Sequence, residues 1–171
     1  MNKMADVYLE KLVLNIGIGQ NEQGYNSAKA LLEKLTSHTA MPTKAKKRDP
    51  SLKIRKGQVI GAMVTLRKDE ATEMLRKALD AVNNSIKESA ITDNSLSFGI
   101  KEYIDFTGIK YDPKIGMLGM NVNATFSRKG KRTALRRRSR GVIKKTHAIV
   151  GRDEIAKLLA DKFNVKIGAE Q

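Results

Sequence analysis

Apolar residues stand at every second position over residues 11–19, where Leu12, Leu14, Ile16 and Ile18 alternate with other side chains. Because successive side chains of a strand point to opposite faces, this period predicts a half-buried β-strand. Similar patterns predict further strands elsewhere in the chain. They lie at residues 59–67, 96–100 and 118–126, with a short edge strand expected to close the sheet at residues 163–167.

Helical spacing marks three other segments. Residues 24–37 repeat apolar side chains three and four positions apart, which favours an amphipathic helix. A second helix is expected to begin with Asp69 as its N-cap, and its apolar stripe extends from Met74 to Ile86. A short third helix is predicted over residues 152–162.

The order of these elements favours an α+β fold. We expect a two-layer sandwich, in which a mainly antiparallel sheet carries helices on one face, together with long basic loops. The length of 171 residues fits a single domain over residues 1–171. Pro42, Pro50 and Gly57 argue against a helix between residues 41 and 61, so that segment is predicted to be a loop or a hairpin arm. A sheet covered on one face leaves its other face open to a ligand.

Charge changes this picture, because the net charge of +15 is concentrated in two places. Residues 43–58 and 128–147 hold seventeen basic residues and one acid, Asp49, so the rest of the chain is nearly neutral. The first set comprises Lys44, Lys46, Lys47, Arg48, Lys53, Arg55 and Lys56. The second comprises Arg128, Lys129, Lys131, Arg132, Arg136, Arg137, Arg138, Arg140, Lys144 and Lys145. Such segments of one sign predict a polyanionic partner. Aromatic residues make up only 5% of the chain, so we do not expect a platform on which the bases of single strands stack. Recognition is instead expected through phosphates and the shape of folded RNA.

Two simpler interpretations of the basic segments are disordered tails and a nuclear import signal. The first segment argues against both, because Pro42, Leu52 and Ile54 are interleaved with its cations and predicted elements enclose it. The second segment could be disordered until RNA supplies counter-charge, because its ten like charges repel one another.

The sequence shows no arrangement of residues that is typical of an enzyme's active site. Cysteine is absent and His38 and His147 are the only histidines, so we expect no metal site and no cofactor. The Gly17-Ile18-Gly19 stretch lacks the third glycine of a dinucleotide-binding loop. Glu102, Asp105 and Asp112 are expected to form ion pairs or cap turns, and no catalytic residues are assigned. No apolar run approaches the ~20 residues that cross a bilayer, so we expect a cytoplasmic protein without a membrane partner.

Seven short motifs together resemble a known family. They are LNIGIG at residues 14–19, TKAKK at 43–47, IRKG at 54–57, IG at 60–61, VTLR at 64–67, SFGIKEYIDF at 97–106 and GIKYDP at 108–113. In this order and with these gaps they resemble the universal large-subunit ribosomal protein "five", in its archaeal form. Each motif is modest alone, and the set is specific. The resemblance extends from about residue 12 to the C-terminus.

The resemblance implies a structural protein of the large ribosomal subunit that binds 5S rRNA in the central protuberance. Its further implied partners are large-subunit rRNA, P-site tRNA, neighbouring large-subunit proteins and a small-subunit head protein across an intersubunit bridge. Carried over by position, the 5S rRNA contacts would include Asn15, Thr65 and Arg67. The basic residues of 43–58 would face tRNA and rRNA, and those of 128–147 would contact rRNA phosphates.

Two positions depart from the family pattern. His38 stands where the family often has glutamine, and Asn121 stands where it often has aspartate. Both replacements keep the ability to form hydrogen bonds. We therefore expect His38 and Asn121 to belong to the 5S rRNA contacts as well.

Two other functions remain as alternatives. A nonspecific nucleic-acid packaging protein would share the charge but would show no preference among RNAs. An RNA-processing enzyme would need several carboxylates gathered around a metal, and no such cluster is visible in the sequence.

Overall fold

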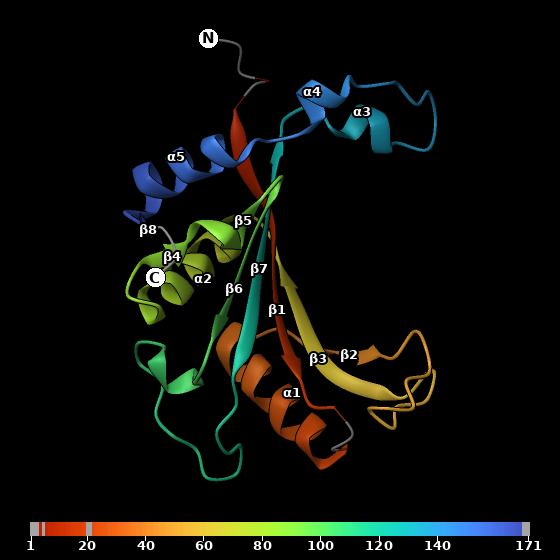
Figure 1. The fold of residues 1–171 in the computed structure, drawn as a ribbon, viewed down its shortest axis with the longest axis vertical. Coiled ribbons are helices and arrows are strands. Elements are labelled where there is room, and N and C mark those ends of the chain that lie inside the picture. Colours follow the sequence, from red (N-terminus) through yellow and green to blue (C-terminus); the bar gives the residue numbers. More distant parts are fainter. Residues whose placement is uncertain (1–3, 5, 20–21, 169–171) are drawn as a thin grey trace. The chain divides into compact units, whose positions relative to one another are not determined.

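The structure is a computed structural model, and it describes residues 4, 6–19 and 22–168. The fold is of the expected α+β class, with a mainly antiparallel sheet in the strand order β2-β3-β1-β7-β6-β5 (Figure 1). The strands of this sheet are β1 (Val7–Gly17), β2 (Met41–Lys44), β3 (Val59–Leu66), β5 (Ile91–Thr92), β6 (Ser95–Ile100) and β7 (Met120–Arg128). The α-helices are α1 (Glu22–Thr36), α2 (Lys68–Ala81), α3 (Arg132–Leu135), α4 (Lys145–Ala148) and α5 (Arg152–Phe163).

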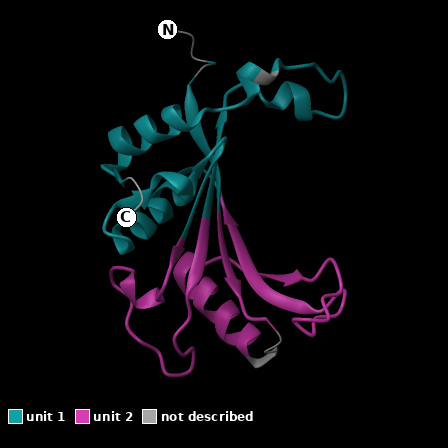
Figure 2. Ribbon diagram, viewed as in Figure 1, with its two compact units in different colours: residues 1–12, 67–98, 123–171 teal, residues 13–66, 99–122 magenta. Residues whose placement is uncertain are grey.

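The chain divides into two compact units (Figure 2). Unit 1 contains residues 1–12, 67–98 and 123–171, and unit 2 contains residues 13–66 and 99–122. Strands β1, β6 and β7 each begin in one unit and end in the other. That all 171 residues form a single domain therefore stays a prediction.

The core of unit 2 lies between α1 and the strands. Leu14 and Ile16 of β1 are buried, and so are Leu31 and Leu32 of α1. Helix α1 contacts β3, whose buried residues alternate with exposed ones. The predicted period of two therefore gives each strand one apolar and one polar face, because only one side is covered.

The core of unit 1 contains the apolar stripe of α2. Its buried residues are Ala71, Met74, Leu75, Ala78 and Leu79, as the helical spacing predicts. Helix α5 contacts β5 and buries Ile155, Leu159 and Phe163. Ala124 and Phe126 of β7 are also fully buried.

Two local predictions about α2 were wrong. The N-cap of α2 is Arg67. Asp69 lies in the first turn, where its negative charge interacts favourably with the helix dipole. Helix α2 ends at Ala81, before Ile86, because Asn83 and Asn84 adopt left-handed backbone conformations, with φ of 56° and 53°. Ile86 then lies in β4 (Ser85–Lys87) and not on the helix.

The expected closing strand at residues 163–167 also differs from the structure. Phe163 still belongs to α5, and the strand that follows is β8 (Lys166–Gly168). It pairs in parallel with β4 in a separate two-stranded sheet and not with the main sheet. Asn164 has a left-handed φ of 53°, which ends the helix and turns the chain toward β4.

Candidate nucleic-acid interface

Two asparagines lie on the polar face of the sheet in unit 2. Asn15 of β1 is half-buried and Asn121 of β7 is exposed, and these two strands are neighbours. In both strands the residues before and after the asparagine are buried on the opposite side. A Cβ atom added at Gly99 would lie 3.4 Å from the Asn121 Oδ1 atom. A methyl group at this position would therefore make an ordinary van der Waals contact with the amide.

His38 and Thr65 line one depression in unit 2. His38 lies two residues beyond the end of α1, and Thr65 is an exposed residue of β3. Met41 and Met63 are cross-strand partners in the same depression, with 60% and 38% of their surface exposed. The depression thus combines an imidazole, a hydroxyl and two flexible apolar side chains.

Arg67 occupies the N-cap position of α2 and is exposed. It belongs to unit 1, whereas the other four predicted 5S rRNA contacts belong to unit 2. The structure therefore places His38 and Thr65 in one depression, and it places Asn15 and Asn121 on neighbouring strands. Arg67 directly follows β3 and lies two residues along the chain from Thr65.

The first basic segment is an ordered hairpin extension, which we call the basic loop (residues 43–58). Strands β2 and β3 pair in antiparallel fashion, with an irregularity of register between Thr43 and Lys44. Beyond the strands, the Ala45 amide donates to the Gln58 carbonyl over 2.8 Å, and the Gly57 amide donates to the Ala45 carbonyl over 2.9 Å. All seven basic side chains of the loop are exposed. The prediction of a loop or a hairpin arm in this segment is therefore confirmed.

Asp49, the single acid of the basic loop, organises the tip of the loop. Its Oδ1 atom accepts hydrogen bonds from the Ser51 hydroxyl (2.6 Å) and from the amides of Ser51 (3.0 Å) and Leu52 (3.4 Å). The backbone of Asp49 also exchanges two hydrogen bonds with Ile54. The hydrogen bond from Ser51 is the main reason that the pKa of Asp49 is lowered. This carboxylate therefore shapes the turn and stays charged at neutral pH.

The second basic segment, residues 128–147, we call the arginine arm. Three of its cations pair with acids of unit 1. The Arg128 Nη2 atom lies 2.7 and 2.6 Å from the Glu154 carboxylate oxygens. The Lys131 Nζ atom lies 2.9 Å from Glu10 Oε2, and the Lys129 Nζ atom lies 4.0 Å from Asp6 Oδ2. Arg128 and Lys131 thus form short ion pairs at the base of the arm, whereas the Lys129 pair is longer and about half-exposed.

The remaining described cations of the arm point outward. Exposed side chains are those of Arg132, Arg136, Arg137, Arg138, Arg140 and Lys144. Two of them also bind the arm itself: Arg136 Nε donates to the Ser139 carbonyl and Arg140 Nε donates to the Ala134 carbonyl, each over 2.6 Å. The side chain of Lys145 lies outside the described part of the arm, so its predicted phosphate contact is still a prediction.

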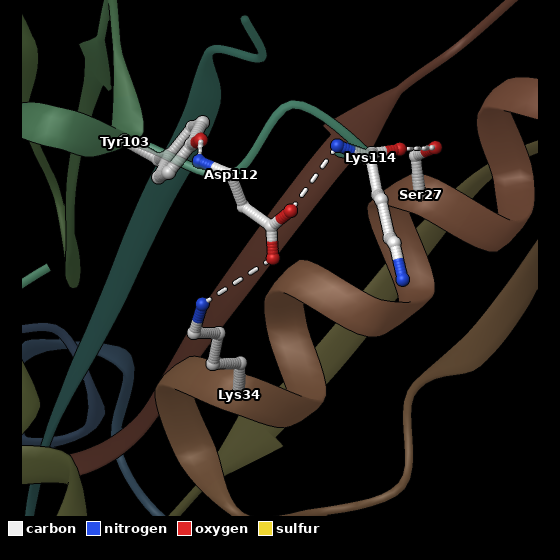
Figure 3. A network of polar contacts seen from close by, with 5 residues as sticks. All are labelled: Ser27, Lys34, Tyr103, Asp112 and Lys114. Atoms are coloured by element: carbon white, nitrogen blue, oxygen red, sulfur yellow. Dashed lines mark hydrogen bonds and ion pairs between the residues drawn. The ribbon is translucent and has the colours of Figure 1, made fainter. Parts of the chain in front are cut away.

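Asp112 is one of the three acids, with Glu102 and Asp105, that were expected to form ion pairs or cap turns. Asp112 forms an ion pair with Lys34 over 3.6 Å, and its Oδ1 atom accepts a hydrogen bond from the Lys114 amide (Figure 3). The Asp112 amide donates to the Tyr103 hydroxyl over 2.9 Å. The prediction that this acid makes an ion pair and caps a turn is confirmed.

The described residues show neither a candidate metal site nor a candidate membrane-spanning helix. No group of three or more histidine and acidic side chains in the described residues could hold a metal ion. Within the same part of the chain, no helix is both long enough and apolar enough to cross a bilayer.

Four residues of these surfaces were not singled out from the sequence. Met41 and Met63 could have been found from the strand period, because Met63 falls on the polar face of β3. Glu10 and Glu154 carried no such signal, because they lie 121 and 26 residues from their basic partners.

Comparison with known proteins matches the chain almost from end to end. Residues 2–55 match the family model described as ribosomal protein L5, and residues 59–158 match the model of the C-terminus of the same ribosomal family. Relatives named large ribosomal subunit protein uL5 include that of Sulfurisphaera tokodaii, which is 40% identical over 98% of this chain and 95% of its own length. The corresponding protein of Methanobrevibacter smithii is 37% identical over 99% of this chain and 100% of its own. That of Pyrobaculum aerophilum is 40% identical over 89% and 86%. The chain therefore belongs to the ribosomal protein L5 family, in its archaeal form.

Proposed function

We propose that this protein binds 5S rRNA in the central protuberance through the polar face of its sheet. As a member of its family it is a structural constituent of the large ribosomal subunit in the cytoplasm, and it is not an enzyme. In the proposed interface Asn15, Thr65 and Arg67 supply specificity, and His38 and Asn121 add further contacts. Large-subunit rRNA and neighbouring large-subunit proteins complete its surroundings.

The pair of asparagines on neighbouring strands is the observation that carries this proposal. Amide groups can donate and accept hydrogen bonds, so they can read base edges and 2′-hydroxyls in folded RNA. Asn121 is exposed beside a glycine, and Asn15 is half-exposed at the centre of the sheet. A polar strip bounded by buried residues supports contact with a shaped surface better than insertion into a deep pocket.

The cations are proposed to supply most of the affinity. Seven exposed basic side chains lie on the basic loop, and six lie on the outward side of the arginine arm. Each cation that neutralises a phosphate releases a counterion, so binding should weaken steeply with salt. The sheet face would then decide which RNA is bound, because phosphate contacts alone carry no sequence information.

The basic loop is further proposed to face P-site tRNA. Its ordered hairpin and seven exposed cations suit the ribose-phosphate backbone of a folded RNA. A contact with a small-subunit head protein across an intersubunit bridge is proposed from the family resemblance. Crosslinking of purified ribosomes that carry P-site tRNA would test both contacts, and the absence of crosslinks from the loop to tRNA would contradict the first.

A competition experiment tests the main proposal. Labelled 5S rRNA bound to the purified chain is challenged with unlabelled 5S rRNA, tRNA, an unrelated structured RNA and duplex DNA. The titration is done near physiological salt, where the screening length is about 8 Å. Efficient competition by 5S rRNA alone supports the proposal. Equal competition by every polyanion would replace it with the nonspecific packaging function.

A matched pair of variants tests the proposed contact of Arg67. Arg67→Ala should weaken 5S rRNA binding by ~1–3 kcal/mol, because it removes a charge-assisted contact. Arg76→Ala removes the same charge from an exposed position of α2 and should change binding little. Equal affinities of the two variants at fixed salt would remove Arg67 from the interface.

A further inference from the structure

We propose that Glu154 and Glu10 are positioning residues for RNA binding, because they clamp the base of the arginine arm and so aim its outward cations at RNA phosphates. This inference rests on the proposed RNA contact of the arm. It assigns a role in RNA binding to two acids, although a carboxylate near RNA repels phosphates. It also divides the basic residues of the arm into anchors and phosphate-facing groups.

The first anchor joins Arg128, the last residue of β7, to Glu154 in the first turn of α5. Both carboxylate oxygens lie within 2.7 Å of Nη2, so the contact is a short, charge-assisted hydrogen bond. The Arg128 side chain is only 15% exposed, and its Nε atom is buried with no hydrogen-bond partner among the described residues. Arg128 therefore depends on Glu154, because a buried guanidinium without a partner is costly.

The second anchor lies three residues further along the arm. Lys131 precedes α3 and lies 2.9 Å from Glu10, whose side chain is 24% exposed. The hydrogen bond from Lys131 is the main reason that the pKa of Glu10 is lowered, so the pair is charged at neutral pH. Between the two anchors the chain turns at Gly130, where φ is 94°. The Lys129–Asp6 pair is longer and more exposed, so it adds little.

Beyond the anchors the arm closes on itself. The Gly141 amide donates to the Thr133 carbonyl over 3.0 Å, and the Arg136 amide donates to the Arg132 carbonyl over 2.8 Å. The Nε atoms of Arg136 and Arg140 bind backbone carbonyls of the arm, and both side chains are still exposed to solvent. A closed loop that is clamped at its base keeps a fixed pattern of charges. Release of the clamp would leave the same charges without a fixed pattern.

A positioning role and the change in net charge predict opposite changes in the affinity for 5S rRNA. Glu154→Gln removes a negative charge from the unit that carries the arm, so electrostatics alone predicts tighter binding of 5S rRNA. A clamp predicts weaker binding, by at least about 3-fold, and a shallower slope of log K against log salt. Each phosphate contact that is lost removes about 0.9 from that slope. Glu10→Gln should act in the same direction.

Asp153→Asn is the matched control. Asp153 is an exposed acid beside Glu154 in the same first turn of α5, so its removal changes the local charge equally. The affinity of this variant for 5S rRNA should equal or slightly exceed that of the unmodified chain. The exchange variant Arg128→Glu with Glu154→Arg rebuilds the pair in reverse and should recover part of the lost affinity.

Two further measurements separate the possible failures. Limited trypsin digestion without RNA should cut Glu154→Gln faster at residues 132–144 than it cuts Asp153→Asn. Should Glu154→Gln fail to fold, Glu10→Gln and Arg128→Lys carry the same test. The proposal is overturned if the glutamine variants bind 5S rRNA as Asp153→Asn does, or more tightly. If triple alanine replacement of Arg136, Arg137 and Arg138 leaves affinity and salt slope unchanged, the proposed RNA contact of the arm itself fails, and the positioning role fails with it.

Discussion

Two glycines of unit 2 should respond in opposite ways to the same substitution. Gly61 lies in β3 at a buried position, and a Cβ atom added there would lie 2.6 Å from the carbonyl oxygen of Ile16. That oxygen belongs to the backbone of β1 and cannot rotate away. Among the described residues, no atom lies within 4 Å of a Cβ added at Gly17, and the φ of Gly17 is not positive. The structure thus offers a clash and a matched open site in the same unit.

The expected cost of Gly61→Ala follows from these distances. Relief of the clash requires a separation of at least 3.4 Å, so the two strands must part by about 0.8 Å at this point. The Ile18 amide is 3.0 Å from the Ile60 carbonyl, and a shift of that size would break this hydrogen bond. One lost hydrogen bond and the strain of overpacking together predict ~1–3 kcal/mol of destabilisation. In a chain of this size the melting temperature falls by roughly 2–4 °C for each kcal/mol.

Thermal and urea unfolding of the two variants would measure this difference. Gly17→Ala should be neutral or should stabilise the fold by up to about 1 kcal/mol, because alanine restricts the unfolded chain and meets no obstacle in the folded one. Gly61→Ala should melt several degrees below it. Indistinguishable melting temperatures for the two variants would contradict this expectation, since they would show that the sheet absorbs the added methyl group without separation of its strands.

Three further predictions concern the core, pH and the basic loop. Phe126→Ala should lower the free energy of unfolding by about 3–5 kcal/mol in urea titrations, because Phe126 is fully buried, and a cost below about 1 kcal/mol would contradict its place in the core. The pKa of Glu10 is lowered from its ordinary value of 4.5, so its ion pair stabilises the fold above about pH 4.5, and this stability is lost as the pH falls through the folded-state pKa. Urea unfolding between about pH 6 and 3 should therefore show a smaller acid loss for Glu10→Gln than for the unmodified chain, and parallel curves would argue against the pair. Joint alanine replacement of Lys46, Lys47 and Arg48 should flatten the salt dependence of tRNA binding by up to about 2–3 units, and an unchanged slope would show that they miss the phosphates.

Much of the fold could be predicted because the burial of one face of a strand or helix produces a periodic pattern of apolar residues in the sequence. Strands β1, β3, β6 and β7 and the stripe of α2 follow from which side chains are covered, and that is visible in the order of residues. The end of α2 was missed because Ile86 continues the apolar spacing, whereas the left-handed Asn83 and Asn84 decide the backbone. The partner of β8 was missed because pairing depends on the direction in which the chain leaves α5, and the residue pattern does not contain this direction.

The site divides in the same way. That two segments are cationic is visible from charge alone, and so is the exposure of the basic loop. Which cations are available is not visible, because the partners of Arg128 and Lys131 lie far away in the sequence and meet them only in the fold. The resemblance named Asn15, Thr65 and Arg67, and their contacts with 5S rRNA stay predictions until they are tested.

The hydrogen bonds within the basic loop bear on the thermodynamics of association. A free segment of this length would lose roughly 1–2 kcal/mol of backbone entropy per residue on being fixed against RNA. Here Asp49 and the bonds of Ala45 impose much of that order during folding, before RNA is met. Association with RNA should then show a small entropic penalty and a modest change in heat capacity. A flexible basic segment that folds only on binding would show larger values of both. Cations on such a rigid frame respond to the spacing of phosphates, so the loop should discriminate between RNA shapes that carry equal charge.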